Sequence, residues 1–187
     1  MKKKLFTLVF LLLCLSLSAY GTIAYFTAED TATNVITAGN IKINLQELAV
    51  SGEEKSTVPF VDVTGVMPGM EISKIVQVEN TGDQPAYVRI KLNKAILLAD
   101  GVQSNTGEGL ITMDINTDCW MEQDGYYYYR EPLAAGKTTS PLFTEVSFSK
   151  EMGDLYQNSQ AVITVNADAT QARNNGDNAV TANGWPT

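Results

Sequence analysis

Hydrophobic and polar residues alternate with a period of two along much of the chain after residue 40. The alternation is clearest over residues 86–92, where every second residue is aliphatic: Ala86, Val88, Ile90 and Leu92. The same pattern recurs over residues 41–45, 71–79, 142–148 and 161–169. A period of two is typical of strands that bury one face. The pattern therefore predicts strands distributed over the whole chain.

Shorter apolar runs at residues 57–64, 110–115, 119–121 and 126–130 add weaker strand predictions. Proline, glycine and asparagine indicate turns at residues 66–70, 80–85 and 124–125, and a polar loop at residues 47–56. Strands over 71–79 and 86–92, joined by the polar turn between them, predict a hairpin. Residues 95–99 favour a short helix. Together these elements predict an all-β fold, a jelly-roll-like antiparallel β-sandwich with short helical turns in the connections.

The first 22 residues follow a different pattern. Three lysines, Lys2 to Lys4, precede an apolar run over residues 5–17, and small or mixed residues follow it. This order is typical of a secretory signal peptide. The run is shorter than the roughly 20 residues that a membrane-spanning helix needs, although a retained N-terminal anchor is the alternative. We predict a signal peptide over residues 1–25 and a single domain over residues 26–187.

The segment after the apolar run carries a more specific signal. An aromatic pair, Tyr25 and Phe26, leads into a Thr- and Asn-rich stretch, then Thr37-Ala-Gly and an alternating strand. This order resembles the export signal of the TasA and camelysin family of Gram-positive spore-formers, whose members are cut by a dedicated signal peptidase called SipW. The resemblance implies cleavage between Tyr25 and Phe26. An ordinary small-residue site would instead place the cut after Gly21.

Further matches to this family follow in order, at residues 68–74, 78–83, 86–90, 124–129, 133–139 and 165–172. The resemblance implies a jelly-roll sandwich and self-assembly into fibres of a biofilm matrix. In that family the mature N-terminal segment adds as a strand to the neighbouring subunit. Residues 26–40 are then the candidate donor segment, and the residues we assign to it are Phe26, Ala28, Ala32, Val35 and Ile36.

Charge restricts the partners. The chain of 187 residues has 13 Lys and Arg and 21 Asp and Glu, and loss of the three signal-peptide lysines leaves a net charge of −11. A strongly acidic protein lacks the basic patches that bind nucleic acids or anionic membranes. The family resemblance implies other copies of the chain as partners and, during export, a SipW-type signal peptidase. We expect no nucleic acid partner and no membrane contact after processing.

The sequence offers little catalytic chemistry. It contains no histidine, so the paired histidines of a zinc peptidase helix are absent. Cys119 is the one cysteine after the signal peptide, and no histidine can accept its proton. We expect Cys119 to pack beside Trp120 and the protein not to be an enzyme. A camelysin-like peptidase is the least favoured reading.

Two binding alternatives stay open. The consecutive tyrosines Tyr126 to Tyr129 are suited either to stacking on sugars or to packing within the domain, and strand geometry favours packing. Asp168 and the asparagines of residues 174–178 supply oxygen atoms that suit calcium, but their spacing matches no EF-hand loop. We therefore predict no cofactor, with calcium as the alternative. The function predicted is a secreted structural protein of an extracellular matrix; the alternative is a monomeric surface-binding module, such as an adhesin or carbohydrate binder.

Overall fold

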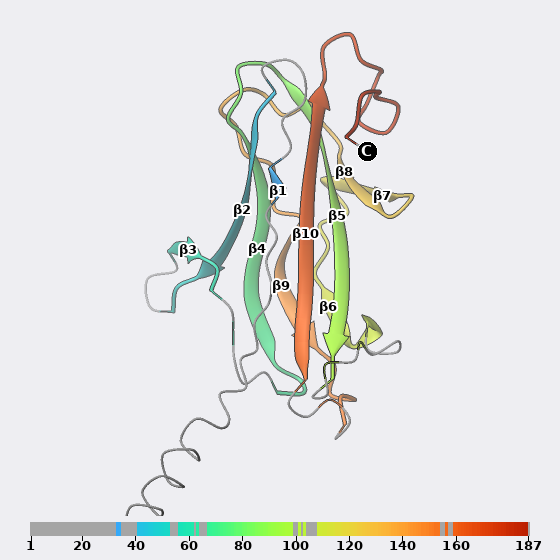
Figure 1. Cartoon of the computed structure of the whole chain (residues 1–187). Helices are drawn as coiled ribbons and strands as arrows, with labels where there is room; N and C mark the ends of the chain where they lie inside the picture. Colours follow the sequence, from blue (N-terminus) through green and yellow to red (C-terminus); the bar gives the residue numbers. More distant parts are fainter. Residues whose placement is uncertain are drawn as a thin grey trace, which may run out of the picture.

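Two five-stranded sheets pack face to face in the computed structural model (Figure 1). The structure describes residues 33–34, 41–52, 56–61, 63, 67–98, 101, 103, 108–153, 156 and 159–186. Sheet A has the order β1-β10-β5-β8-β7 and sheet B the order β3-β2-β4-β9-β6. The β-sandwich predicted from the alternating pattern is confirmed.

The strands of sheet A are β1 (Thr33–Asn34), β10 (Gln160–Gln171), β5 (Ala86–Leu97), β8 (Tyr126–Tyr129) and β7 (Trp120–Gln123). Those of sheet B are β3 (Thr57–Pro59), β2 (Ile43–Val50), β4 (Glu71–Asn80), β9 (Phe143–Phe148) and β6 (Ile111–Met113). One short 3-10 helix, η1 (Glu108–Leu110), lies in a connection. All pairs are antiparallel except β1 with β10. From β4 onward the chain crosses repeatedly between the sheets, as jelly-roll connectivity requires.

The core lies between the sheets and is built from alternate residues of the long strands. The largest side chains with almost no exposed surface are Trp120, Phe143, Ile90, Ile96, Ile111 and Leu142. The buried apolar residues of β10 are Ile163, Val165, Ala167 and Ala169, and they follow the alternation predicted from the sequence. One face of each long strand is apolar. A shift of the strand pairing by one residue would move these buried apolar side chains to the solvent-facing side, so the apolar face fixes the register.

The predicted hairpin over residues 71–92 is wrong. β4 lies in sheet B and β5 in sheet A, so residues 81–85 cross between the sheets. The buried Asn80 shapes this crossing, because its amide donates to the carbonyls of Gln84 and Leu133 at 2.8 and 2.9 Å. Its Oδ1 accepts a hydrogen bond from the Gly82 N–H. The turn-forming residues correctly predict a connection between β4 and β5, but they do not specify which sheet the chain enters next.

Two further local predictions are corrected. The predicted loop at residues 47–56 begins later, because β2 continues to Val50 and Leu48 pairs with Ile75 of β4. Within the predicted helix at residues 95–99, residues 95–97 are instead the end of β5, where Leu97 pairs with Gln160 of β10. In both cases pairing with a long neighbouring strand outweighs the weak local preference.

The predictions for the N-terminus lie mostly outside the described residues. These are the signal peptide, the cleavage pair Tyr25 and Phe26, and the donor residues Phe26, Ala28, Ala32, Val35 and Ile36. Within the candidate donor segment the structure describes Thr33–Asn34, which forms β1. In the part of the chain that is described, no helix has the length and apolar character needed to cross a bilayer.

Candidate functional site

The outer edge of β10 is the first candidate site. On one side β10 pairs with β5 along all twelve of its residues. On the other side, among the described residues, it pairs only with the two residues of β1, in the register Thr33 with Asn166 and Asn34 with Ala167. The outer edge of a strand is a template for pairing with an added strand. The described pairing with β1 shows that this edge of β10 accepts one.

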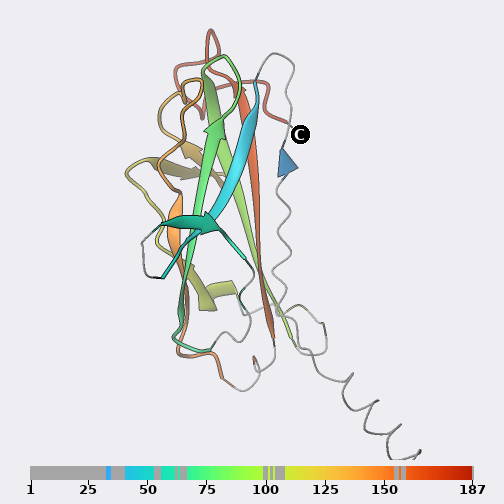
Figure 2. The same cartoon turned by 90° about the vertical axis from the view of Figure 1, so that its left-hand side faces the viewer.

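This edge lies at the seam of the sandwich. β1 approaches β2 of sheet B as well as β10 of sheet A (Figure 2). The residues of β10 that point inward are small or β-branched and buried, including Val165 and Ala167. A strand added here would extend sheet A beside β2 of sheet B. The pairing with β1 is parallel, so an added strand in the same place would run in the direction of β10.

A second feature is the C-terminal tail, residues 172–186, which folds back beside the strands of sheet A (Figure 1). It forms a separate apolar cluster on the outer face of that sheet, in which Tyr87 and Tyr128 pack against Ala179 and Ala182. Trp185 meets Tyr128 edge-on at a ring-centroid distance of 5.9 Å. The tail therefore covers the tyrosines that point away from the main core.

Arg89 fixes the end of this tail. Its Nε donates to Asp168 Oδ2 at 2.9 Å, and its Nη2 donates to the Pro186 carbonyl at 2.9 Å. The guanidinium carbon also lies 4.0 Å from the centre of the Tyr126 ring and 4.7 Å from that of Trp185. Planar guanidinium groups suit such stacking. The Asp168 carboxylate is therefore engaged with an arginine, which does not favour the calcium alternative at this residue.

The four tyrosines divide as strand geometry predicts. Tyr127 and Tyr129 pack against the main core, and the ring centroids of Tyr129 and Trp120 are 5.0 Å apart. Tyr126 and Tyr128 belong to the cluster under the tail. Both pairs are thus packed within the domain, and the packing interpretation is confirmed.

The structure places the catalytic candidate Cys119 within the packing of the domain. Cys119 is half-buried and packs against the main core, next to Trp120 in sequence. The described residues contain no group of three or more histidine, cysteine, aspartate or glutamate side chains that could hold a metal ion.

An inward-facing ion pair was not predicted. Lys74 Nζ lies 2.9 Å from Glu47 Oε2, with side-chain exposures of 3% and 7%. The same ammonium lies 4.0 Å from the centre of the Phe60 ring. The sequence predicts a loop at Glu47, so it does not indicate the pairing of this residue with β4. The sequence signal for this ion pair is Lys74 itself, which shares the buried face of β4 with Val76 and Val78.

Asp114 links the β6–β7 connection to β9. Its Oδ1 accepts hydrogen bonds from the backbone N–H groups of Thr144 and Glu145 at 2.8 and 2.7 Å. Burial raises the pKa of this carboxyl, but these bonds and one from the Thr144 hydroxyl lower it more, so the pKa lies below its ordinary value of 3.8. The charged carboxylate therefore stabilises the fold.

We expect an Asp114→Asn variant to be less stable than the wild type, and the difference to depend on pH. A folded-state pKa below the unfolded value contributes stability that is present above the unfolded pKa. That contribution is lost as the pH falls through the folded pKa. Urea unfolding at several pH values should therefore show the largest difference above pH 3.8 and a shrinking one below it. Asp124→Asn, at the exposed tip of the β7–β8 hairpin, is the matched control; a constant difference for Asp114→Asn would contradict the assignment.

Comparison with known proteins gives one match. The family described as camelysin metallo-endopeptidase matches residues 1–177. Neither the curated proteins nor the solved structures searched gave a significant match. The matched region includes β1 and β10, whereas Ala179, Ala182 and Trp185 of the tail lie beyond it.

Proposed function

This chain belongs to the camelysin family, which is also the family of TasA, and from that membership we propose that it is a secreted structural protein that assembles into extracellular matrix fibres. Assembly uses the N-terminal segment of one copy as a strand added to the next. A SipW-type signal peptidase releases this segment during export. The mature protein then acts by polymerising, without a cofactor.

One observation carries the proposal: part of the candidate donor segment already lies as a strand on the edge of β10. Thr33 and Asn34 belong to residues 26–40, and their backbone pairs in register with Asn166 and Ala167. A neighbouring copy has the same segment and the same edge. Exchange of an identical element between copies is an accessible route to assembly, because the contacts are the same in both states.

Pairing along β10 supplies the driving force in this proposal. β10 is twelve residues long and offers a correspondingly long ladder to a donated strand. Strand addition gains affinity from main-chain hydrogen bonds and fit from alternate side chains. The sequence of residues 26–38 is rich in Thr and Ala and poor in large apolar residues, so it gains little by collapsing onto its own domain. An extended, donated state is therefore the favoured use of this segment.

The family description includes a peptidase activity, and we propose that this chain lacks it. The sequence has no histidine, the usual zinc ligand and neutral-pH base. We expect the purified protein to show no chelator-sensitive cleavage of casein or of a peptide library. A Cys119→Ala variant is the control, because activity lost in that variant would assign catalysis to Cys119.

Electron microscopy of the secreted chain tests the structural role. We expect fibres with one globular unit per repeat. The surface-binding alternative expects persistent monomers with affinity for glycans. The packing of Tyr126 to Tyr129 within the domain gives that alternative no exposed aromatic platform. Monomers that bind glycans and form no fibres at high concentration would contradict the proposal.

A further inference from the structure

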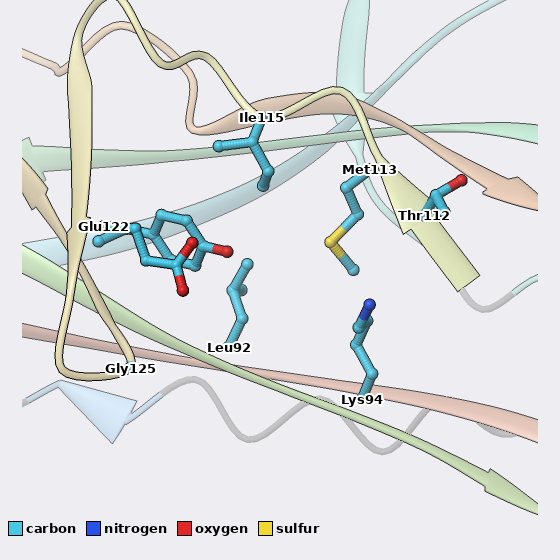
Figure 3. A pocket seen from close by; sticks show the side chains of 8 residues that line it. Leu92, Lys94, Thr112, Met113, Ile115, Glu122 and Gly125 are labelled. Carbon is cyan, nitrogen blue, oxygen red and sulfur yellow. The ribbon is translucent and has the colours of Figure 1, made fainter. Parts of the chain in front are cut away.

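The pocket beside the β7–β8 hairpin has its charges engaged within the domain. It has a volume of about 350 Å³ and lies between β5, β6 and the hairpin. Figure 3 shows Glu122 and Lys94 on opposite sides of Leu92. Lys94 Nζ donates to the Ile111 carbonyl at 2.8 Å, and the Tyr127 hydroxyl donates to the Glu122 carboxylate. Reactive chemistry that the fold leaves open lies instead in the C-terminal tail.

The tail contains two Asn-Gly pairs, Asn175-Gly176 and Asn183-Gly184. In such a pair the backbone nitrogen of the glycine, which no Cβ shields, can attack the Cγ atom of the preceding asparagine. The two glycines have nearly the same backbone conformation, with φ angles of 76° and 75°. The two pairs therefore differ mainly in how the structure holds the asparagine side chain.

The side chain of Asn175 is held by the loop that it closes. Its Nδ2 donates to the carbonyls of Gln171 and Asn183 at 2.8 and 2.9 Å. Its Oδ1 accepts a hydrogen bond from the Asn183 N–H at 2.9 Å. The amide must leave all of these partners before its Cγ atom can be attacked. The fold therefore protects Asn175 from deamidation.

Asn183 is held by its backbone instead. Its side chain is exposed, and the hydrogen bonds that the structure shows at this residue use its N–H and its carbonyl. Rotation of the side chain breaks none of these bonds. Asn183 is therefore the reactive member of the two Asn-Gly pairs.

We propose that Asn183 is a site of spontaneous deamidation, and that the isoaspartate formed there releases the end of the tail from sheet A. The Gly184 nitrogen attacks Asn183 Cγ, its proton passes to the side-chain nitrogen, and that nitrogen leaves as ammonia, which closes a succinimide ring. Water then adds to one of the two ring carbonyls and opens the ring, to aspartate or to isoaspartate. Water is the only co-reactant, and no step depends on fibre assembly.

Isoaspartate lengthens the main chain where the tail is fastened. One additional methylene then separates the N–H of residue 183 from the carbonyl that is bonded to Gly184. In the unmodified chain both groups bond to Asn175, and the carbonyl also accepts from the Thr170 hydroxyl at 2.9 Å. Because the additional methylene moves the two groups apart, they cannot keep all three hydrogen bonds.

The residues that follow are then no longer aligned with sheet A. In the unmodified chain the Trp185 ring meets Tyr128 edge-on, and the Pro186 carbonyl accepts from Arg89 Nη2 at 2.9 Å. Both contacts depend on the position in which residue 183 holds the chain. Their loss frees the end of the tail.

Incubation of the secreted chain in mildly alkaline buffer, followed by peptide mapping with mass spectrometry, tests the site. One neutral hydrogen bond is worth up to about tenfold in an equilibrium, and Asn175 must break several. Deamidation should therefore be at least about tenfold faster at Asn183 than at Asn175. The same incubation in urea is the control, because unfolding frees Asn175 and should make the two rates similar. Equal rates in the folded chain, or faster deamidation at Asn175, would overturn the assignment.

Limited proteolysis tests the release of the tail. Anion exchange separates the deamidated chain, which has an additional negative charge, and an isoaspartate-specific methyltransferase identifies the isoaspartate form. Because proteolysis follows the population of the open form, this form should be cleaved within residues 172–186 at least about tenfold faster than the unreacted chain. Asn183→Asp is the matched control, since it has the added charge but a main chain of normal length, and it should be cleaved slowly. Equal cleavage of the isoaspartate form and Asn183→Asp would overturn the proposed release.

Discussion

Deletion of residues 26–34 is expected to leave a folded, soluble domain that no longer polymerises. Among the described residues the buried core begins at Ile41, and β1 contributes Thr33–Asn34 to the sheets. The deletion therefore removes β1 and none of the buried core residues that the structure describes. Far-ultraviolet circular dichroism and thermal unfolding should match those of the full mature chain. Electron microscopy and sedimentation should show fibres only for the full mature chain.

The comparison requires a defined starting point for the full mature chain. N-terminal sequencing of the secreted product should give a first residue near Phe26. A first residue at Thr22 would indicate cleavage by an ordinary signal peptidase.

The deletion also needs a control variant. A C-terminal deletion of equal length is a poor control, because the tail is packed against sheet A. A variant with residues 26–32 replaced by a Gly/Ser sequence and residues 33–34 retained is the better one, because it keeps β1. Fibres formed by the truncated protein at the rate of the full chain would show that another segment is the donor.

The second large effect is expected at Arg89. Arg89→Met should lower the free energy of unfolding by about 3–5 kcal/mol, because it leaves the Asp168 carboxylate partly buried without its partner. The same change removes the contact with the Pro186 carbonyl and the stacking on Tyr126 and Trp185. The tail should then detach. Urea unfolding measures the first effect, and faster proteolysis within residues 172–186 measures the second.

Two further variants separate the ion pair from the general cost of changing this strand. Lys91→Met replaces an exposed cation two residues away on the same face, and its effect should stay within about 0.5 kcal/mol. Arg89→Met combined with Asp168→Leu removes both charges and should recover part of the lost stability, since an apolar pair can replace a buried ion pair. The tail should remain detached in this double variant. A loss below about 1 kcal/mol for Arg89→Met would show that the aromatic packing alone holds the tail.

Much of the fold could be predicted because its cause is local. The period of two identified β2, β4, β5, β9 and β10, and in each the alternate apolar residues are the buried ones. Asp124 and Gly125 were read as a turn, and both have positive φ, 52° and 77°, as a tight hairpin turn requires. These features depend only on neighbouring residues. Sequence alone was therefore sufficient for them.

The connection after β4 shows where local information ends. Turn-forming residues are needed both for a hairpin and for a crossing between sheets. The crossing depends on Asn80, which bonds to the Leu133 carbonyl, a residue 53 positions away. No local pattern encodes that contact. The hairpin prediction failed for this reason.

The candidate sites depend even more on distant contacts. Arg89 and Asp168 meet because β5 and β10 pair in one particular register, with these two residues opposite each other. The tail has no periodicity, and its order comes from Arg89 and the tyrosines of β8. Lys94 and Glu122 share a pocket only because the β7–β8 hairpin is shorter than β5. Sequence reasoning could name these residues as charged, but it could not bring them together.

Disulfide trapping across β1 and β10 tests the central claim most directly. Thr33 and Asn166 are paired in register, and neighbouring strands lie about 4.7–4.9 Å apart, within the range of Cα distances that a disulfide can span. The experiment uses a Thr33→Cys/Asn166→Cys variant with Cys119→Ala, oxidised after fibres have formed. Each single-cysteine variant serves as a control. Strand donation predicts a ladder of disulfide-linked oligomers on a non-reducing gel, whereas intact fibres that yield only internally cross-linked monomers would contradict it.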